Sequence, residues 1–323
     1  MRPDRYNRVH VNEARNDIFP RVSIGIPTYN GAQRIVSTIA SILNQGYPNL
    51  EIIISDNCSS DNTEEVCATL CKKNQSLHYF RQKENIGIIG NYKFVLSQAS
   101  GELYMWVADD DFLEPGILQK YVDFLTSHHG YSLVSGKIQY WSGDQTAFVE
   151  KDFNLEHNSC YRRVIRYYSK VIHGAIYYGL MPRQIATKLP LQNRMGEDWH
   201  FVAKVAFLGK IKMFDCIGYN KKLNGSSKTL KHYAKLIGAP WFSTNFPHAQ
   251  IALDAFVEIM TSPIYIERPL YSRLVLALGA CFGTLFNHYG RQYPFIIGGK
   301  IRRLFGFKKK LRMPNSLKEE WAW

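Results

Sequence analysis

The sequence lacks the paired cysteines of a zinc site or a disulfide framework. Its six cysteines are scattered along 323 residues, and no two of them form a Cys-x-x-Cys pair. Cys67 and Cys71 would lie on one helix face, but no nearby histidine or second cysteine pair completes a set of zinc ligands. We therefore expect reduced thiols, which are typical of a cytosolic protein.

Long apolar runs are also missing. The N-terminus carries charged residues but lacks the apolar segment of a signal peptide. The apolar run from Leu274 to Phe286 has thirteen residues, which is too short to cross a bilayer. The sequence thus predicts no membrane-spanning helix and a protein that stays inside the cell.

Two common phosphate-binding motifs are absent. No Gly-x-Gly-x-x-Gly motif follows the first predicted strand, and no Walker loop with Gly-Lys-Ser or Gly-Lys-Thr occurs anywhere. A dinucleotide-dependent dehydrogenase and a P-loop nucleotidase are therefore disfavoured.

What the sequence has is a large apolar fraction and an excess of positive charge. Hydrophobic residues make up 46% of the chain, enough for a large buried core. The formal net charge of +13 indicates anionic partners: nucleotide phosphates, an acidic membrane surface or nucleic acid. Charge alone does not choose among them.

Predicted strands and helices alternate after an N-terminal arm, residues 1–20. Such alternation predicts an α/β fold with a mostly parallel sheet covered by helices on both faces, and ligands bind beyond the carboxyl ends of the strands in such sheets. Polar clusters at 28–30, 55–57 and 109–111 all fall at that edge. The predicted strands are 22–27, 50–54, 77–81 and 103–108, and the predicted helices are 35–43, 63–71 and 89–98.

Three adjacent acids, Asp109, Asp110 and Asp111, follow the fourth strand directly. Adjacent carboxylates at a strand end either face open water or bind a cation, because like charges are costly to bury together. Carboxylate oxygens suit Mg²⁺ or Mn²⁺, which usually keeps positions free for substrate phosphates. A metal–diphosphate site and a solvated acidic loop both remain open at this point.

Residues 22–115 resemble the family 2 glycosyltransferases, inverting enzymes with the GT-A fold, a Rossmann-like sheet with flanking helices. The resemblance lies in four motifs in fixed order: Pro-Thr-Tyr-Asn at 27–30, "IISDNCSSDNT" at 53–63, "ENIGIIGNYKFVLSQASGEL" at 84–103, and the acid triplet closed by Pro115. A nucleotide-sugar donor is the substrate that this resemblance implies.

The resemblance also implies roles for the residues of these motifs. Asp56 would hydrogen-bond the nucleotide base, and Asp110 would bind the divalent metal, Mn²⁺ or Mg²⁺, with Asp111 as a further ligand. Ala108 stands where many members have an acid, which leaves the division of roles among the three acids open. Loop capping is the alternative for Asp56 and Tyr29. The other residues expected to contact the donor are Pro27, Thr28, Tyr29, Asn85, Gly87 and, near the ribose, Asp109.

A second acidic pair, Glu197-Asp198, precedes a predicted helix. The helix dipole stabilises carboxylates in the first turn of a helix, so charge complementarity alone would explain the pair. The resemblance implies instead that Asp198 is the catalytic base, with Glu197 as the second candidate. His173 lies in a segment, 173–179, that resembles the family's acceptor-facing strand, and we expect it to be packed in the core rather than catalytic.

The remaining segments are less specific. Residues 131–140 should add strands to the sheet, 161–171 should be a helix, and 212–220 should return as a strand. Residues 221–227 resemble a flexible loop that closes over the diphosphate. Asn224 replaces the histidine usual there, so Lys221 or Lys222 would supply positive charge instead.

From about residue 246 the chain should form a helical, basic region, 246–323, outside the catalytic domain at 21–245. Phe295 to Arg312 mixes large apolar residues with lysines and arginines. This composition suits an anionic membrane face, although a solvated basic helix has the same signature.

These patterns together predict an inverting, metal-dependent transferase of single sugars from a UDP-sugar to a glycan acceptor. A lipid-linked acceptor at the inner membrane face, in cell-surface polysaccharide or O-antigen-like assembly, would explain the basic tail. No Gln-x-x-Arg-Trp motif of processive synthases is present. The alternatives are a nucleotidyltransferase, which usually needs a lysine-containing phosphate loop after its first strand, and a nucleic-acid binder, which would not explain the clustered acids.

Overall fold

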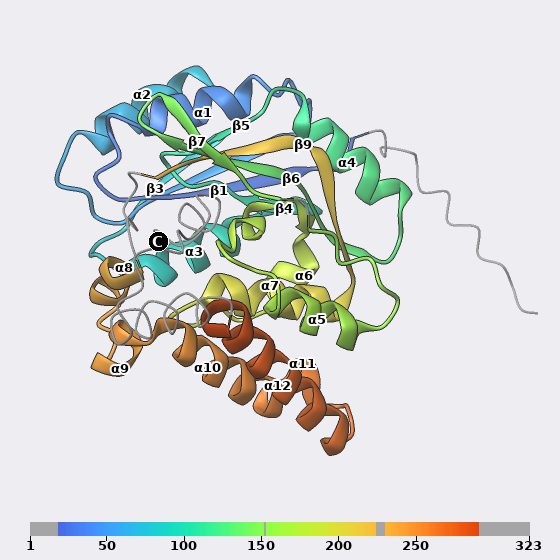
Figure 1. The fold of residues 1–323 in the computed structure, drawn as a ribbon. Coiled ribbons are helices and arrows are strands. Elements are labelled where there is room, and N and C mark those ends of the chain that lie inside the picture. The colour runs from blue at the N-terminus through green and yellow to red at the C-terminus, as the bar shows by residue number, and fades with distance from the viewer. Residues whose placement is uncertain (1–18, 152, 224–229, 291–323) are drawn as a thin grey trace, which may run out of the picture.

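The computed structural model describes residues 19–151, 153–223 and 230–290. The N-terminal arm and the predicted basic amphipathic segment at 295–312 therefore lie outside the described residues. Within them, the chain forms two sheets and several layers of helices (Figure 1).

The main sheet has the order β3-β2-β1-β4-β8, and its first four strands are parallel. Only β8 runs antiparallel, against β4. All four predicted strands are confirmed, and so is the α/β fold class. The strands are β1 (Val22–Thr28), β2 (Leu50–Asp56), β3 (Leu77–Arg81), β4 (Leu103–Trp106) and β8 (Met181–Pro182).

Side chains of the central strands alternate between two apolar cores, one on each face of the sheet. On β4, Tyr104 and Trp106 belong to one core, while Met105 belongs to the other. A parallel sheet covered on both faces needs apolar residues at every position, so the strands read as continuous apolar runs. One face carries α1 (Ile35–Leu43), α2 (Thr63–Lys73) and α4 (Ile117–Ser127), and the other carries α3 (Gly87–Gln98) and α7 (Glu197–Leu208) (Figure 1).

Residues 131–142 do not extend the main sheet as expected. They form β6 (Tyr131–Ser142), which lies in a second sheet of order β5-β9-β6-β7 and pairs with β9 in parallel. The predicted strand at 212–220 is confirmed as part of β9. The bounds of the other members are β5 (Phe112–Leu113), β7 (Gln145–Val149) and β9 (Lys210–Lys222). The sequence could not assign β6 to a sheet, because its partner lies about 80 residues later.

The predicted strand at 173–179 is wrong. Gly174 adopts φ +67°, and the chain then makes a 3₁₀ turn, η1 (Ala175–Tyr178). A side chain at Gly174 would be strained at this φ, and its Cβ would lie 2.5 Å from Asp198 Oδ2. The turn therefore exists because the backbone must pass closely by the start of α7.

The C-terminal helices pack on the preceding part of the chain through a shared core. Buried Ile251, Ala255, Leu276 and Ala280 belong to the same apolar cluster as Trp106. Figure 1 shows these helices as the layer farthest from the main sheet, beneath α5 and α7. The second half contains α5 (Cys160–Tyr168), α6 (Arg183–Lys188), α8 (Leu230–Leu236), α9 (Trp241–Asn245), α10 (Pro247–Thr261), α11 (Pro263–Ile266), α12 (Leu270–Leu285) and the π-helical turn η2 (Phe286–Gly290).

The expectation that no helix is long enough to span a bilayer is wrong. Leu270 to Gly290 forms 21 continuous helical residues that contain an 18-residue window with a mean hydropathy of 1.3, so this helix is long and apolar enough by composition to cross a membrane. The thirteen-residue run underestimated this helix because Arg273 interrupts the apolar sequence. Arg273 donates to the Met260 carbonyl oxygen at 2.6 Å, so this charge lies against α10.

Candidate active site

The three polar clusters predicted at one sheet edge lie together there. Thr28 and Asp56 are paired residues at the ends of β1 and β2. Asn57 continues the contact, because its N–H donates to the Thr28 carbonyl oxygen at 2.9 Å. The acid triplet follows β4, the neighbour of β1 on the other side. The carboxyl edge of the parallel strands thus collects the candidate donor-binding residues.

Asp56 is completely buried, yet its carboxylate has a polar environment. Its Oδ1 accepts from the Ser59 N–H at 2.9 Å and from the Ser59 hydroxyl. Its Oδ2 accepts from the Tyr79 hydroxyl at 2.7 Å and lies 3.4 Å from Arg81 Nη1. Arg81 is partly exposed and also pairs with Glu64 at 2.9 Å. Asp56 therefore organises the β2 loop and orients an exposed arginine at the sheet edge.

Asp109 is held by an arginine from the first helix. Arg34 donates from Nε and Nη2 to its two carboxylate oxygens, at 3.2 and 3.0 Å, and Thr28 Oγ1 donates to Oδ2 at 2.5 Å. Burial raises the pKa of Asp109, and the Arg34 charge and hydrogen bond oppose this shift. The Thr38 hydroxyl donates to the carbonyl oxygens of Asp109 and Asp111, which fixes the backbone of the triplet.

Asp111 has its own protein partners. The Tyr219 hydroxyl donates to Oδ2 at 2.9 Å, the Lys222 N–H donates to Oδ1 at 2.8 Å, and Lys221 Nζ lies 3.4 Å from Oδ2. Burial raises the pKa of Asp111 to about 6, and the Lys221 charge opposes the shift. Asp111 is thus a buried acid that ties the triplet to β9.

Asp110 differs from both neighbours. It is partly exposed, and within the described ranges its carboxylate makes no hydrogen bond or ion pair. Arg34 and Lys221 act on it only through longer-range attraction. No group of three or more His, Cys, Asp or Glu side chains in the described part of the chain could enclose an ion. One open carboxylate fits Mg²⁺ or Mn²⁺ whose other ligands are phosphates and water.

The residues expected beside the donor differ in how open they are. Pro27 and Thr28 are buried in β1, whereas Tyr29 is 46% exposed. The Asn85 side chain accepts from the Asn57 amide and the Gly87 N–H, both at 2.9 Å. Asn85 and Gly87, which has φ +76°, therefore shape the loop before α3.

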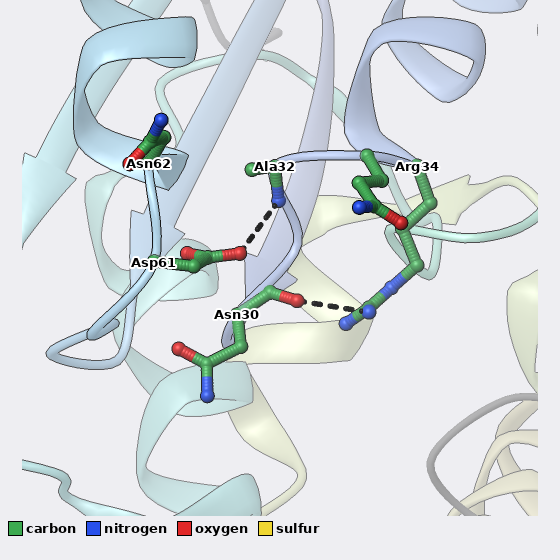
Figure 2. A pocket seen from close by; sticks show the side chains of 6 residues that line it. Asn30, Ala32, Arg34, Asp61 and Asn62 are labelled. Carbon is green, nitrogen blue, oxygen red and sulfur yellow. Dashed lines mark hydrogen bonds between the residues drawn. The ribbon is translucent and has the colours of Figure 1, made fainter.

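A shallow hollow of about 510 Å³ lies on the outer side of the same loops. Figure 2 shows Asp61 accepting from the Ala32 N–H, and the Arg34 guanidinium directed toward the Asn30 carbonyl oxygen. Arg34 connects the hollow to Asp109, but no acid of the triplet lines it. The hollow is therefore a neighbour of the acid edge and not the site itself.

Asp198 is the second residue of α7 and lies in its first turn, directly after Glu197. Burial raises the pKa of Asp198 to about 6; the Trp199 N–H and the charge of Lys221 oppose the shift, and the charge of Glu197 adds to it. Lys221 Nζ lies 4.9 Å from the centre of the Tyr178 ring. Burial raises the pKa of the Tyr178 hydroxyl, and the charges of Asp111 and Asp198 add to this shift. One lysine therefore connects the acid triplet with the candidate base.

Glu197 has a different environment from its neighbour. It is buried, accepts from Arg194 Nε at 2.6 Å, and has Lys204 Nζ at 3.6 Å. Glu258 of α10 pairs with the same two cations, at 2.7 and 3.5 Å. We name Arg194, Glu197, Lys204 and Glu258 the interior ion cluster. The cluster joins the start of α7 to the C-terminal helices.

His173 lies against the rings of Tyr140 and Phe148, with centroids 5.2 and 5.1 Å away. Its Nε2 is buried and has no hydrogen-bond partner among the residues that the structure describes, and burial lowers the pKa of His173 to about 4. The imidazole is therefore neutral and packed among aromatic rings at neutral pH. Asn224 and the rest of the expected diphosphate loop, 224–227, lie outside the described residues.

Sequence reasoning missed Arg34, Tyr79 and Tyr219 as partners of the edge acids. Their contacts join residues 75, 23 and 108 positions apart, so no local pattern reveals them. The only available signal was the polar character of Arg34 in the first turn after the Pro-Thr-Tyr-Asn motif.

The sequence also matches a model of a known protein family. The family described as "Glycosyl transferase family 2" matches residues 23–189, about half of the chain. Among curated proteins, the chain is 36% identical over 137 residues to the GalNAc(5)-diNAcBac-PP-undecaprenol beta-1,3-glucosyltransferase of Campylobacter jejuni, covering 42% of this chain and 41% of that protein. It is 31% identical over 122 residues to the putative teichuronic acid biosynthesis glycosyltransferase TuaG of Bacillus subtilis, covering 36% and 48%. The matched region thus spans less than half of either relative.

Solved structures share the fold over most of the chain. S. aureus TarS 1-349 in complex with UDP-GlcNAc superposes with a TM-score of 0.61 at 19% identity, covering 88% of this chain and 77% of that chain. The mannosyltransferase PcManGT from Pyrobaculum calidifontis in complex with GDP-Man and Mn²⁺ gives 0.54 at 17% identity, covering 90% and 82%. At these identities the likeness establishes the fold.

Proposed function

Because this chain belongs to glycosyl transferase family 2, we propose that it transfers one sugar from a UDP-sugar to a hydroxyl group of a glycan acceptor, with inversion at the anomeric carbon. The relative from C. jejuni is named for an undecaprenol-linked glycan, and TarS was solved with UDP-GlcNAc. These names support a lipid-linked glycan as the acceptor and a uridine nucleotide in the donor. The enzyme would then work at the cytoplasmic face of the membrane.

One observation carries the proposal. Asp110 is an open carboxylate where the strand ends converge, and Lys221 connects this edge with Asp198. A transferase needs a positive environment for the leaving diphosphate and a carboxylate base on the acceptor side of the sugar. The two acids, with a lysine whose charge acts on both, would supply this pair of environments.

The donor would bind along the carboxyl edge. Asp56 and Arg81 would bind the base by hydrogen bonds, and the exposed ring of Tyr29 would cover it. Asp109 would lie beside the ribose, held by Arg34 and Thr28. Asp110 would bind Mg²⁺ or Mn²⁺ together with the diphosphate oxygens, while Asp111 holds Lys221 nearby. A bound divalent ion supplies charge neutralisation for the leaving group.

The transfer step would use Asp198. The acceptor oxygen attacks the anomeric carbon, its proton passes to the Asp198 carboxylate, and the bond from that carbon to the diphosphate oxygen breaks. The electron pair of that bond leaves with the nucleoside diphosphate, and Lys221 stabilises its charge. With a pKa of about 6, Asp198 is mostly ionised at neutral pH and can return the proton to water afterwards.

Glu197 would act differently, although both acids were candidates for the base. Its two cationic partners and its burial suit a role in fixing the first turn of α7. A carboxylate engaged in this way is less available to accept a proton from a substrate. Glu197 would therefore position Asp198 through the backbone that they share.

A panel of nucleotide sugars tests the function directly. Purified protein should release nucleoside diphosphate from one UDP-sugar in the presence of Mg²⁺ or Mn²⁺, and chelation should remove this activity. Asp110→Asn should lower metal-dependent hydrolysis and transfer by about 100-fold or more, because metal stabilisation contributes several kcal/mol. Asp123→Asn, which changes an exposed carboxylate of α4 that accepts from Gln119 Nε2 at 2.7 Å, is the matched control. Unchanged hydrolysis in Asp110→Asn would overturn the metal assignment.

A further inference from the structure

The C-terminal helix α12 is apolar on two opposite faces. Its inner face buries Leu276, Ala277 and Ala280. The packing there is close, because a Cβ at Gly279 would lie 2.9 Å from Ile165 Cδ1 and one at Gly283 would lie 2.5 Å from Ser169 Oγ. A helix that packs so tightly on α5 is fixed to the catalytic domain by this face.

The opposite face of α12 is exposed, although it consists of large apolar side chains. Their spacing of three or four positions places them on one stripe of the helix. The stripe, named here the outer face, contains Tyr271, Leu274, Val275, Leu278, Phe282 and Phe286, which are 73, 42, 62, 55, 70 and 59% exposed. Leu253 and Val257 of the neighbouring α10 are also about half exposed and one helical turn apart. Exposed apolar patches of this extent usually mark an interaction surface.

Charge distinguishes the partner that this surface fits. Residues Leu270 to Leu285 include no acid and only one base, Arg273, which bonds to the α10 backbone. The chain that follows, 291–323, contains nine lysines and arginines against two glutamates, so this tenth of the sequence holds more than half of the net charge of +13. An uncharged apolar stripe followed directly by a basic segment complements an anionic lipid surface.

We propose that the outer face of α12, with Leu253 and Val257 of α10, docks this protein on an anionic membrane as an interfacial surface. The helix lies along the membrane rather than through it, because its inner face is committed to α5 and α10. The inference names a membrane-docking surface for the proposed enzyme, and it rests on the C-terminal helices and on the charge of the sequence after them, not on the transfer reaction. Vesicle binding therefore tests it without reference to transfer activity.

The test uses flotation of the full chain with vesicles of phosphatidylcholine alone or mixed with phosphatidylglycerol. We expect binding to the mixed vesicles and little binding to the neutral ones. Tyr271→Glu combined with Phe282→Glu should weaken partitioning by about tenfold or more, because both side chains would enter the interface. Leu208→Glu, at an exposed apolar position at the end of α7, is the matched control and should bind as the unchanged protein does.

Each variant must unfold at the same temperature as the unchanged protein, so that a loss of vesicle binding does not reflect a loss of folding. Equal partitioning of the double variant and the unchanged chain would overturn the proposal. Retention in vesicles after alkaline carbonate extraction would overturn the interfacial arrangement in favour of a spanning helix. If the double variant instead converts a dimer to a monomer in solution and binds vesicles normally, the outer face contacts a second copy and the proposal is wrong.

Discussion

Two acidic groups in this molecule are neutralised in different ways. In the interior ion cluster, Glu197 and Glu258 are buried, and each is paired with both Arg194 and Lys204. At the sheet edge, Asp109 and Asp111 have fixed partners, but the Asp110 carboxylate has none among the described residues. Buried acids that stabilise a fold need their counter-charges in the protein, whereas a site for an ion or a diphosphate leaves a charge for the ligand to balance.

Asp198 stands between these two groups. It follows Glu197 directly in sequence, yet the cation that acts on it is Lys221, the partner of Asp111. Adjacent positions in the first turn of a helix point in different directions, so Glu197 enters the cluster while the charge of Lys221 acts on Asp198. Neighbours in sequence therefore have separate roles, and substitutions should separate them.

The largest effect should come from Asp198→Asn. Removing the proposed base should lower the rate of transfer by about 10²- to 10⁴-fold. Donor affinity, measured by calorimetry with the UDP-sugar, should change little, because the proposed role of Asp198 is toward the acceptor and not the donor. Thermal stability should also be kept, since burial already favours the neutral form of this carboxyl group. Turnover at the original rate would move the base to another residue.

Glu258→Gln should act on stability instead. Burial alone would raise the pKa of Glu258, but Lys204 and Arg194 outweigh burial and lower it. Breaking a buried ion pair by removing one partner costs about 3–5 kcal/mol of unfolding free energy. Chemical denaturation measures this loss.

Asp254→Asn is the matched control, because it changes an acid one turn earlier on α10 that accepts from Gln250 Nε2 at 2.9 Å. The control should lose about 1 kcal/mol or less, the usual value for a neutral hydrogen bond. Equal losses in the two variants would show that the interior ion cluster does not stabilise the junction of α7 and α10.

The polar edge of the main sheet was predictable because its signals are local. Each strand reads as an apolar run that ends in polar residues, and parallel strands bring those ends together without knowledge of any contact. Thr28, Asp56 and the acid triplet therefore lie where the sequence placed them. The partners that distinguish the three acids come from Arg34, Tyr219 and Lys221, which local patterning cannot connect to the triplet.

The second half of the chain was harder to predict, because its structure depends on contacts between distant residues. The turn at 174–178 depends on its approach to Asp198 in α7, and β6 depends on a partner strand far along the chain. The interior ion cluster joins Glu197 to Glu258 across 61 positions. The length of α12 was missed because Arg273, a charge in the sequence, lies against another helix in the structure.

The smallest effect should be in the pH dependence of transfer. A base must be ionised to accept a proton, and the pKa of Asp198 is about 6. Transfer should therefore be nearly constant above pH 7 and fall about tenfold per pH unit below pH 6. Initial rates at subsaturating acceptor, measured across this range with the donor saturating, give the apparent pKa.

Donor affinity shows whether Asp198 or Asp111 causes the fall in transfer at low pH, which is the acid limb of the pH profile. Asp111 also has a pKa of about 6, but its carboxylate belongs to the donor edge. If Asp198 governs the limb, the affinity for the UDP-sugar stays constant while transfer falls. A parallel loss of donor affinity would assign the limb to Asp111, and the edge acids rather than the start of α7 would then control the pH dependence.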